Sequence, residues 1–354
     1  MLLEQLEPSG INLRAVLKTK PGVGFEYRED VEKPKINADQ VLVKVMATGI
    51  CSGDISLYLS GAYVGQAAGY PFIPGHEFAG QITEVGSNVK HLEVGSRVTA
   101  EIMVTCGHCD YCNMGERIYC TSVRELGAEI NGSYAEYIAV PAQNIHVLPD
   151  QVRWEDAALS DCLASALHPF EKLSSEILKN IVILGAGPIG LCATQIAKTL
   201  GAKMVISIDT LPARLELAKQ LGADQTINAD QVEAVKSVQK LTNGLGADAV
   251  IEMTGSPVAV ANSIEMVRKN GEIVWMGHVA ESVALKEFLV MSRGIHIHGC
   301  FNSTWLTYER ALHLMASGRV KMRPFVSHEL PLSEVSKAFD LLMKKQAMKV
   351  LMKP

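Results

Sequence analysis

The sequence predicts an α/β protein in which a mostly β first half is followed by a doubly wound parallel sheet. In the first half, residues 14–47, 72–104 and 133–140 read as strands, because apolar residues nearly alternate there and glycines punctuate them. From about residue 165, continuous apolar runs such as NIVILGAG (180–187) alternate with helical patterns. This alternation is typical of strands that are buried on both faces of a parallel sheet and joined by crossover helices.

Bulk composition fits a globular protein of about two domains. The chain has 354 residues, of which 48% are hydrophobic and 20% charged. With a net charge of -5 and no basic blocks, the sequence does not predict a positively charged surface for nucleic acid or for an anionic membrane. The first residues carry Glu4 and Glu7 and lack the apolar core of an export signal. We therefore expect a cytoplasmic protein in which the eight cysteines stay reduced, and clustered cysteines there indicate metal binding or catalysis and not disulfides.

The segment GAGPIG fits the dinucleotide pattern G-x-G-x-x-G, with cofactor-binding candidates Gly185, Gly187, Pro188, Ile189 and Gly190. It follows an apolar strand and opens a helix, and Asp209 ends the next strand. The alternative is a structural turn in an α/β fold. The carboxylate of Asp209 can accept hydrogen bonds from ribose hydroxyls and would repel a 2′-phosphate, and its neighbours Thr210 and Leu211 are not basic. The pattern therefore favours NAD over NADP.

Four cysteines follow the spacing C-x2-C-x2-C-x7-C, at Cys106, Cys109, Cys112 and Cys120. Four thiolates in so short a loop suit a closed tetrahedral zinc site with a structural role. An iron–sulfur cluster is the rival, since its bacterial motif shares the spacing of the first three cysteines. Here the last gap is longer and no proline follows the fourth cysteine. Reduced cysteines without a metal are the third possibility.

A second group of candidate ligands lies in GICSGD (49–54) and PGHEFAG (74–80). Cys51 alone would most often be a buried thiol. Together with His76 and Glu77 it offers ligands for a zinc ion that keeps an open position. A further ligand should come from elsewhere in the chain, with Asp161 as the candidate and Cys162 as its rival.

These motifs, in this order, resemble the zinc-dependent medium-chain dehydrogenases of the alcohol dehydrogenase superfamily, in particular the polyol (sorbitol-type) and threonine dehydrogenase branches. The resemblance runs from about Ala15 to the C-terminus. It implies a GroES-like, mostly β catalytic domain and a Rossmann domain that binds NAD. The implied boundaries are 1–165 for the catalytic domain with a zinc lobe at 104–122, 166–299 for the Rossmann domain, and 300–354 for a segment that returns to the catalytic domain.

The resemblance also implies roles for individual residues. Catalytic zinc would bind Cys51, His76 and a carboxylate, and Asp161 matches a position where the family usually has Glu. In some members the residue that matches Glu77 binds zinc in place of water. Arg214 matches a basic residue beside the adenosine, and a loop near the nicotinamide matches Met276, Gly277 and His278.

The path of the proton departs from the family pattern. Members usually have Ser or Thr two residues after the ligand cysteine, where this chain has Gly53. Our hypothesis is that Ser52, or Ser56 through a water, replaces it. The alternative is that Ser52 is a turn residue and bulk water takes the proton. By analogy with the family, Asp54 is a structural carboxylate.

Other chemically capable residues are expected in the core. His168 should be a packed, hydrogen-bonded histidine, and Cys162, Cys192 and Cys300 should be buried thiols. The stretch GCFNSTW (299–305) lacks the Arg-Tyr pair that polyol dehydrogenases carry near the substrate, so sorbitol itself is not the expected substrate.

The resulting prediction is a zinc-dependent oxidoreductase that transfers a hydride between a secondary alcohol, such as a polyol, sugar alcohol or derivative, and NAD. An L-threonine 3-dehydrogenase is the enzymatic alternative. A non-catalytic protein that binds the cofactor and kept the fold is the alternative from another class. The expected partners are an alcohol or ketone substrate and further copies of the chain, as a homodimer or homotetramer, with no nucleic acid and no membrane.

Overall fold

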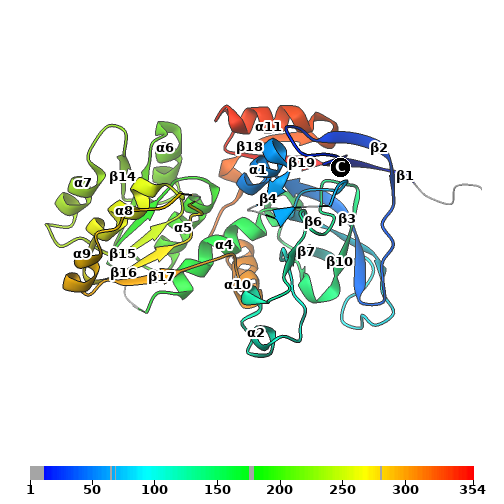
Figure 1. Ribbon diagram of the computed structural model, residues 1–354, viewed down its shortest axis with the longest axis horizontal. Coiled ribbons are helices and arrows are strands. Elements are labelled where there is room, and N and C mark those ends of the chain that lie inside the picture. The colour runs from blue at the N-terminus through cyan, green and yellow to red at the C-terminus, as the bar shows by residue number, and fades with distance from the viewer. Residues whose placement is uncertain (1–11, 64–65, 68, 175–178, 280) are drawn as a thin grey trace, which may run out of the picture. The chain divides into compact units, whose positions relative to one another are not determined.

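The computed structural model describes residues 12–63, 66–67, 69–174, 179–279 and 281–354. The described chain forms two compact units, each considered by itself (Figure 1). The first unit comprises the chain up to Leu159 together with Val326–Pro354, and the second unit comprises Ser160–Phe325.

These divisions differ from the boundaries expected at 165 and 299. The second unit begins with helix α4 (Ser160–Glu171), and residues 300–325 contain helix α10 (Trp305–Ala316). These two helices contact each other, and α10 buries an apolar face that includes Tyr308 and Leu312. Because this packing is internal to the second unit, the chain rejoins the first unit only at Val326.

The first unit is built on a seven-stranded sheet. Its strand order is β11 (Ile145–Val147), β7 (Arg97–Ala100), β6 (Glu77–Val85), β3 (Gln40–Gly49), β19 (Lys349–Lys353) and β18 (Val326–Pro331), with β10 (Tyr137–Pro141) also paired to β3. Among the residues that the structure describes, three two-stranded sheets accompany it: β1 (Asn12–Leu17) with β2 (Glu26–Glu32), β4 (Ala62–Tyr63) with β5 (Gln66–Ala67), and β8 (Met103–Val104) with β9 (Arg124–Glu125). The predicted strands at 14–47, 72–104 and 133–140 are therefore confirmed in type.

Helices and apolar clusters also belong to the described part of this unit. The helices are α1 (Ser52–Ser60), α2 (Asp110–Asn113), α3 (Trp154–Ala157) and α11 (Val335–Met343). One cluster joins α1 and α11, where the rings of Tyr58 and Phe339 stack with centroids 4.5 Å apart. The other packs β3, β6, β7 and β10 through alternate residues such as Val43, Ile82 and Ile138, as strands with one buried face do.

The second unit contains a six-stranded, wholly parallel sheet. Its order is β14 (Gln225–Asn228), β13 (Met204–Asp209), β12 (Asn180–Leu184), β15 (Ala247–Glu252), β16 (Val267–Trp275) and β17 (His296–Gly299). Numbered along the chain, this is the 3-2-1-4-5-6 order of the dinucleotide-binding fold. The doubly wound parallel sheet predicted from the sequence is thus confirmed.

Helices cover both faces of this sheet. Besides α4 and α10 the unit contains α5 (Pro188–Thr199), α6 (Pro212–Gln220), α7 (Ala234–Leu241), α8 (Pro257–Met266) and α9 (Glu287–Arg293). Figure 1 shows α5 on one side of the strands and α8 with α9 on the other. In the part of the chain that the structure describes, none of the helices combines the length and apolar character needed to cross a bilayer.

Candidate functional site

Strand register brings together the cluster of Cys51, His76 and Glu77. Strand β3 pairs antiparallel with β6, and Gly49 at the end of β3 lies opposite Glu77 at the start of β6. Cys51 follows as the N-cap of α1, and His76 directly precedes β6. One thiol, imidazole and carboxylate atom from each residue lie within 4.8 Å of one another. His76 and Glu77 are buried and Cys51 is half-buried.

The donor set of this cluster fits zinc. Thiolate, imidazole and carboxylate are the common zinc ligands, and tetrahedral coordination at about 2.1 Å places ligand atoms roughly 3.4 Å apart. The observed separations therefore require only a small contraction around a metal ion. Burial raises the pKa of the Cys51 thiol, and the neighbouring His76 opposes that shift. A buried thiol of this kind gains most from a cation that stabilises its ionised form.

A carboxylate stands behind the histidine. Asp54 Oδ1 lies 3.8 Å from Nδ1 of His76, and the Asp54 side chain is fully buried. Its other oxygen accepts hydrogen bonds from the backbone N–H of Cys51, at 2.9 Å, and from the Tyr134 hydroxyl, at 2.5 Å. Burial raises the pKa of Asp54, which these hydrogen bonds and His76 oppose. Because Asp54 faces Nδ1, the other ring nitrogen of His76 is the one available to a metal.

A lysine stands behind the glutamate. Lys349, the first residue of β19, places its Nζ 2.6 Å from one carboxylate oxygen of Glu77 and 2.5 Å from the other. It also donates to the carbonyl oxygen of Ile50, at 2.9 Å. Both charged side chains are nearly inaccessible to solvent, 3% for Lys349 and 2% for Glu77. The negative charge of Glu77 is therefore compensated within the first unit.

The other predicted catalytic residues occupy different surroundings. Ser52 and Ser56 lie on α1 with exposed side chains, and Gly53 donates its backbone N–H to Cys51 Sγ at 3.5 Å. The proton relay through either serine stays a hypothesis. Asp161 is buried in the first turn of α4, in the second unit, and its membership of the ligand set also stays a prediction.

The four-cysteine lobe is compact in the way that a metal site requires. Sγ atoms of Cys106, Cys109, Cys112 and Cys120 lie within 4.8 Å of one another, and those of Cys106 and Cys112 are 4.0 Å apart. Zn–S bonds of about 2.3 Å in a tetrahedron would place them roughly 3.8 Å apart. Backbone N–H groups of Cys112 and Thr121 lower the pKa of Cys109 to about 6, whereas burial raises the pKa of Cys112 to about 11, so of these two thiols Cys109 more readily takes the thiolate form that binds metal.

The glycine-rich loop has the geometry of a pyrophosphate cradle. It joins β12 to α5, Gly187 caps the helix N-terminus and Pro188 opens its first turn. A Cβ atom at Gly190 would collide with the carbonyl oxygen of Gly185, so the loop closes on itself only with glycine there. Helix N-termini reached through such loops bind phosphate groups.

The remaining cofactor candidates lie at the carboxyl ends of neighbouring strands. Asp209 ends β13, where it accepts backbone hydrogen bonds from Ala186, Thr210 and Leu211, and Arg214 on α6 is 3.8 Å from it. Met276 and Gly277 follow β16 and donate backbone N–H groups to the Glu252 carbonyl, and His278 is next. Their contacts with a dinucleotide stay predictions, although this edge is where such sheets bind their ligands.

Residues expected to be structural are buried as predicted. His168 is 2% exposed and its Nδ1 lies 2.8 Å from the carbonyl oxygen of Asn302. Cys162, Cys192 and Cys300 are buried, and all eight cysteines are free thiols.

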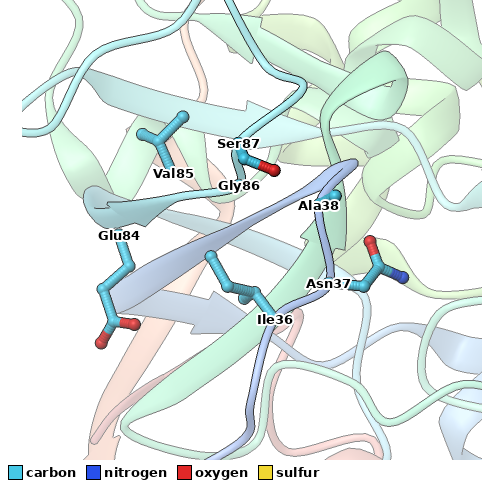
Figure 2. Close-up of a pocket in the computed structure, with 7 residues that line it drawn as sticks. All are labelled: Ile36, Asn37, Ala38, Glu84, Val85, Gly86 and Ser87. Carbon is cyan, nitrogen blue, oxygen red and sulfur yellow. The ribbon is translucent and has the colours of Figure 1, made fainter.

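A shallow hollow elsewhere in the first unit is separate from these sites. Figure 2 shows its lining, which comes from the segment before β3 and the end of β6: Ile36, Asn37, Ala38, Glu84, Val85, Gly86 and Ser87. Its carboxylate, Glu84, pairs with Lys33 at 2.7 Å. This surface offers no cluster of metal-binding groups among its lining residues.

Two residues of the metal cluster's surroundings were not predicted from the sequence. They are Lys349, which binds Glu77, and Tyr134, which binds Asp54. The one signal for Lys349 is that it opens the strand KVLMK, in which three apolar residues follow it. For Tyr134 no signal separates it from the other tyrosines.

Comparison with known proteins agrees with this architecture. Residues 37–150 match the alcohol dehydrogenase GroES-like domain, and residues 188–317 match the zinc-binding dehydrogenase family. The chain is 36% identical to a D-arabitol-phosphate dehydrogenase of Enterococcus avium, over 96% of this chain and 97% of that protein. It is 34% identical to an L-threonine 3-dehydrogenase of Bacillus velezensis, over 98% and 100%.

Among solved structures, a zinc-binding dehydrogenase of Sinorhizobium meliloti 1021 bound to NADP superposes with a TM-score of 0.90 at 28% identity, covering 97% of this chain and 99% of that one. The cofactors of this family are thus zinc and a nicotinamide dinucleotide. Sequence, fold and comparisons lead to one conclusion: the chain belongs to the zinc-dependent medium-chain dehydrogenases and is an oxidoreductase.

Proposed function

We propose that this protein oxidises a secondary alcohol of the polyol class, or reduces the corresponding ketone, with zinc bound at Cys51 and His76 and with NAD as hydride acceptor. The observation that carries the proposal is the buried cluster of Cys51, His76 and Glu77, held by Asp54 and Lys349. Asp161 completes the ligand set in this proposal. When bound, zinc supplies a Lewis acid for the substrate oxygen, and the dinucleotide supplies the hydride acceptor.

The side chains of the cluster have distinct tasks. Cys51 contributes one negative charge as a thiolate, and His76 contributes a neutral nitrogen. One carboxylate supplies the second negative charge, so the site with its zinc dication is formally neutral. Lys349 compensates Glu77 while that carboxylate is away from the metal. Glu77 can therefore leave an open coordination position for the substrate oxygen without becoming an isolated buried charge.

The preference for NAD rests on Asp209. Its carboxylate ends β13, the strand next to the glycine-rich loop, where ribose hydroxyls are bound in this fold. The nearby Arg214 is 3.8 Å from that carboxylate, so its charge is engaged by Asp209. A dianionic 2′-phosphate would have to displace this pairing. Activity with NAD should therefore exceed activity with NADP.

The second candidate is an L-threonine 3-dehydrogenase, because a relative with that name is nearly as similar as the arabitol-phosphate enzyme. Threonine carries an ammonium and a carboxylate, whereas polyol phosphates carry a phosphate dianion. The two candidates therefore differ in the charge of the substrate-binding group that each needs. A homodimer or homotetramer and a cytoplasmic location remain part of the proposal.

The test is a metal and substrate analysis of the purified protein. We expect about two zinc ions per chain, with one lost in Cys51→Ser and the other in Cys106→Ser. Polyols, polyol phosphates and L-threonine are then screened with NAD and with NADP by the absorbance of the reduced cofactor. Cys192→Ala, which changes a buried thiol outside both clusters, serves as the matched control. A single zinc that Cys51→Ser retains would refute the proposed catalytic site.

A further inference from the structure

Asp54 has one carboxylate oxygen fully engaged and the other directed to His76. Oδ2 accepts hydrogen bonds from the Cys51 N–H and the Tyr134 hydroxyl. Oδ1 is buried, lies 3.8 Å from Nδ1 of His76, and accepts no hydrogen bond from the other residues that the structure describes. The orientation of the carboxylate plane is thus fixed by the two donors at Oδ2, which leaves Oδ1 for the imidazole.

Of these two donors, only Tyr134 is a side chain. Its hydroxyl is 2.5 Å from Asp54 Oδ2 and 3.4 Å from the Gly49 carbonyl, and the residue is fully buried. A phenol donating to a carboxylate forms a short, charge-assisted hydrogen bond when the carboxylate is ionised. The backbone donor at Cys51 alone would restrain rotation of the carboxylate about its Cβ–Cγ bond less than the two donors do together.

Tyr134 is also fixed to the segment that carries His76. Its backbone N–H donates to the carbonyl of Pro74 at 3.0 Å. Its ring lies against Gly75, which has a φ of +90° and where a Cβ atom would collide with the ring carbons. The tyrosine therefore contacts the histidine segment through its ring and the carboxylate behind the histidine through its hydroxyl.

We propose that Tyr134 is a positioning residue for the metal-binding histidine, acting through Asp54. Its hydroxyl holds the carboxylate so that Oδ1 can accept the Nδ1–H of His76, which directs the other ring nitrogen to the metal. Phenylalanine would fill the same space and keep the ring contact with Gly75. The structure thus assigns the positioning role to one oxygen atom.

The test is Tyr134→Phe in the full-length, zinc-loaded protein. The rate at which each zinc is lost to a coloured chelator is measured, together with the visible spectrum of the cobalt-substituted protein. Partners that orient metal ligands typically change metal affinity by about 10- to 100-fold. Since Tyr134 acts through Asp54, we expect about tenfold faster loss of the zinc at Cys51, with an altered cobalt spectrum. Loss of the zinc at the four-cysteine lobe should be unchanged.

Tyr70→Phe is the matched control, because it also removes a tyrosine hydroxyl that donates a hydrogen bond within the first unit, to the Gly61 carbonyl at 2.6 Å. Tyr70→Phe should leave both release rates unchanged. Wild-type release of both metals from Tyr134→Phe would overturn the inference. So would equal acceleration of both metals, or the same effect in Tyr70→Phe, because these results indicate general loosening.

This inference rests on the proposed metal role of Cys51 and His76, and the same measurements separate the two. If wild-type protein holds one zinc that Cys51→Ser retains, the proposed function fails. If wild-type protein holds two and Tyr134→Phe releases both normally, only the role of Tyr134 fails.

Discussion

Replacing Lys349 by methionine should destabilise the first unit far more than a typical surface change. Methionine has a similar length and is apolar, so the change removes the charge and keeps most of the packing. In the zinc-free protein, Glu77, which is 2% exposed, would lose the cation that lies within 2.6 Å of its carboxylate. An unpaired buried carboxylate is the most costly product of breaking such a pair.

The size of the effect follows from this distance. Two unit charges separated by 2.6 Å attract by about 6 kcal/mol at an effective dielectric constant of roughly 20. Part of this is recovered because methionine, unlike the ammonium group, has no desolvation cost in the interior. Removal of one partner from a buried pair typically costs about 3 to 5 kcal/mol, and we expect that range for the free energy of unfolding.

Urea unfolding measured by tryptophan fluorescence can report on the first unit alone. Trp154 lies in that unit, whereas Trp275 and Trp305 lie in the second and can be replaced by phenylalanine in a common background. In that background, the double variant Lys349→Met/Glu77→Gln should recover more than half of the loss caused by Lys349→Met. A loss below about 1 kcal/mol for Lys349→Met would refute the reasoning, because it would mean that Glu77 does not depend on this cation.

Three further predictions concern other parts of the chain. Glu136→Gln should lower stability by about 0.5 to 1 kcal/mol at neutral pH. Burial raises the pKa of Glu136, but the hydrogen bonds of Arg14 outweigh burial and hold that pKa below its ordinary 4.5. The stabilisation is therefore lost as the pH falls through the lowered pKa. The urea midpoints of variant and wild type should accordingly converge below about pH 4.5. Gly190→Ala should weaken NAD binding at least about tenfold by calorimetry, because its Cβ would collide with a loop carbonyl, whereas Gly299→Ala, with open space around it, should bind normally. Cys106→Ser should lose one zinc per chain by elemental analysis. Dehydrogenase activity should fall only in the fraction of molecules whose lobe has unfolded, and retention of both metals would contradict the structural-site assignment.

Features that depend on neighbouring residues could be predicted from the sequence. The strand, glycine-rich turn, helix and terminal Asp209 lie in one short stretch, so their pattern indicates both the fold and the expected cofactor. The four cysteines of the lobe are likewise close in sequence, and they are grouped in the structure as the spacing suggests. Cys51, His76 and Glu77 could be proposed together because few other chemically suitable residues lie nearby.

Features that depend on distant residues could not be predicted in the same way. Lys349 and Glu77 are 272 positions apart, and Tyr134 and Asp54 are 80 apart. Lysine and tyrosine are common residues with no distinctive spacing at these places. Helix α10 buries an apolar face, and the sequence does not say which unit covers that face, so the expected boundary at 299 differs from the division at Val326.

The pairing of Gly49 with Glu77 has a consequence for how this chain can vary. Cys51, which follows β3, and the pair His76 and Glu77, at the start of β6, are brought together by the hydrogen-bond register of the two strands. The length of the segment between the strands does not set this alignment. Gly49 and Glu77 should therefore stay opposite each other wherever this strand register is kept. A single-residue slip in either strand would exchange its two faces and separate them. The spacing of these donor groups is therefore inherited through sheet pairing, and substitutions that preserve the pairing should preserve the spacing.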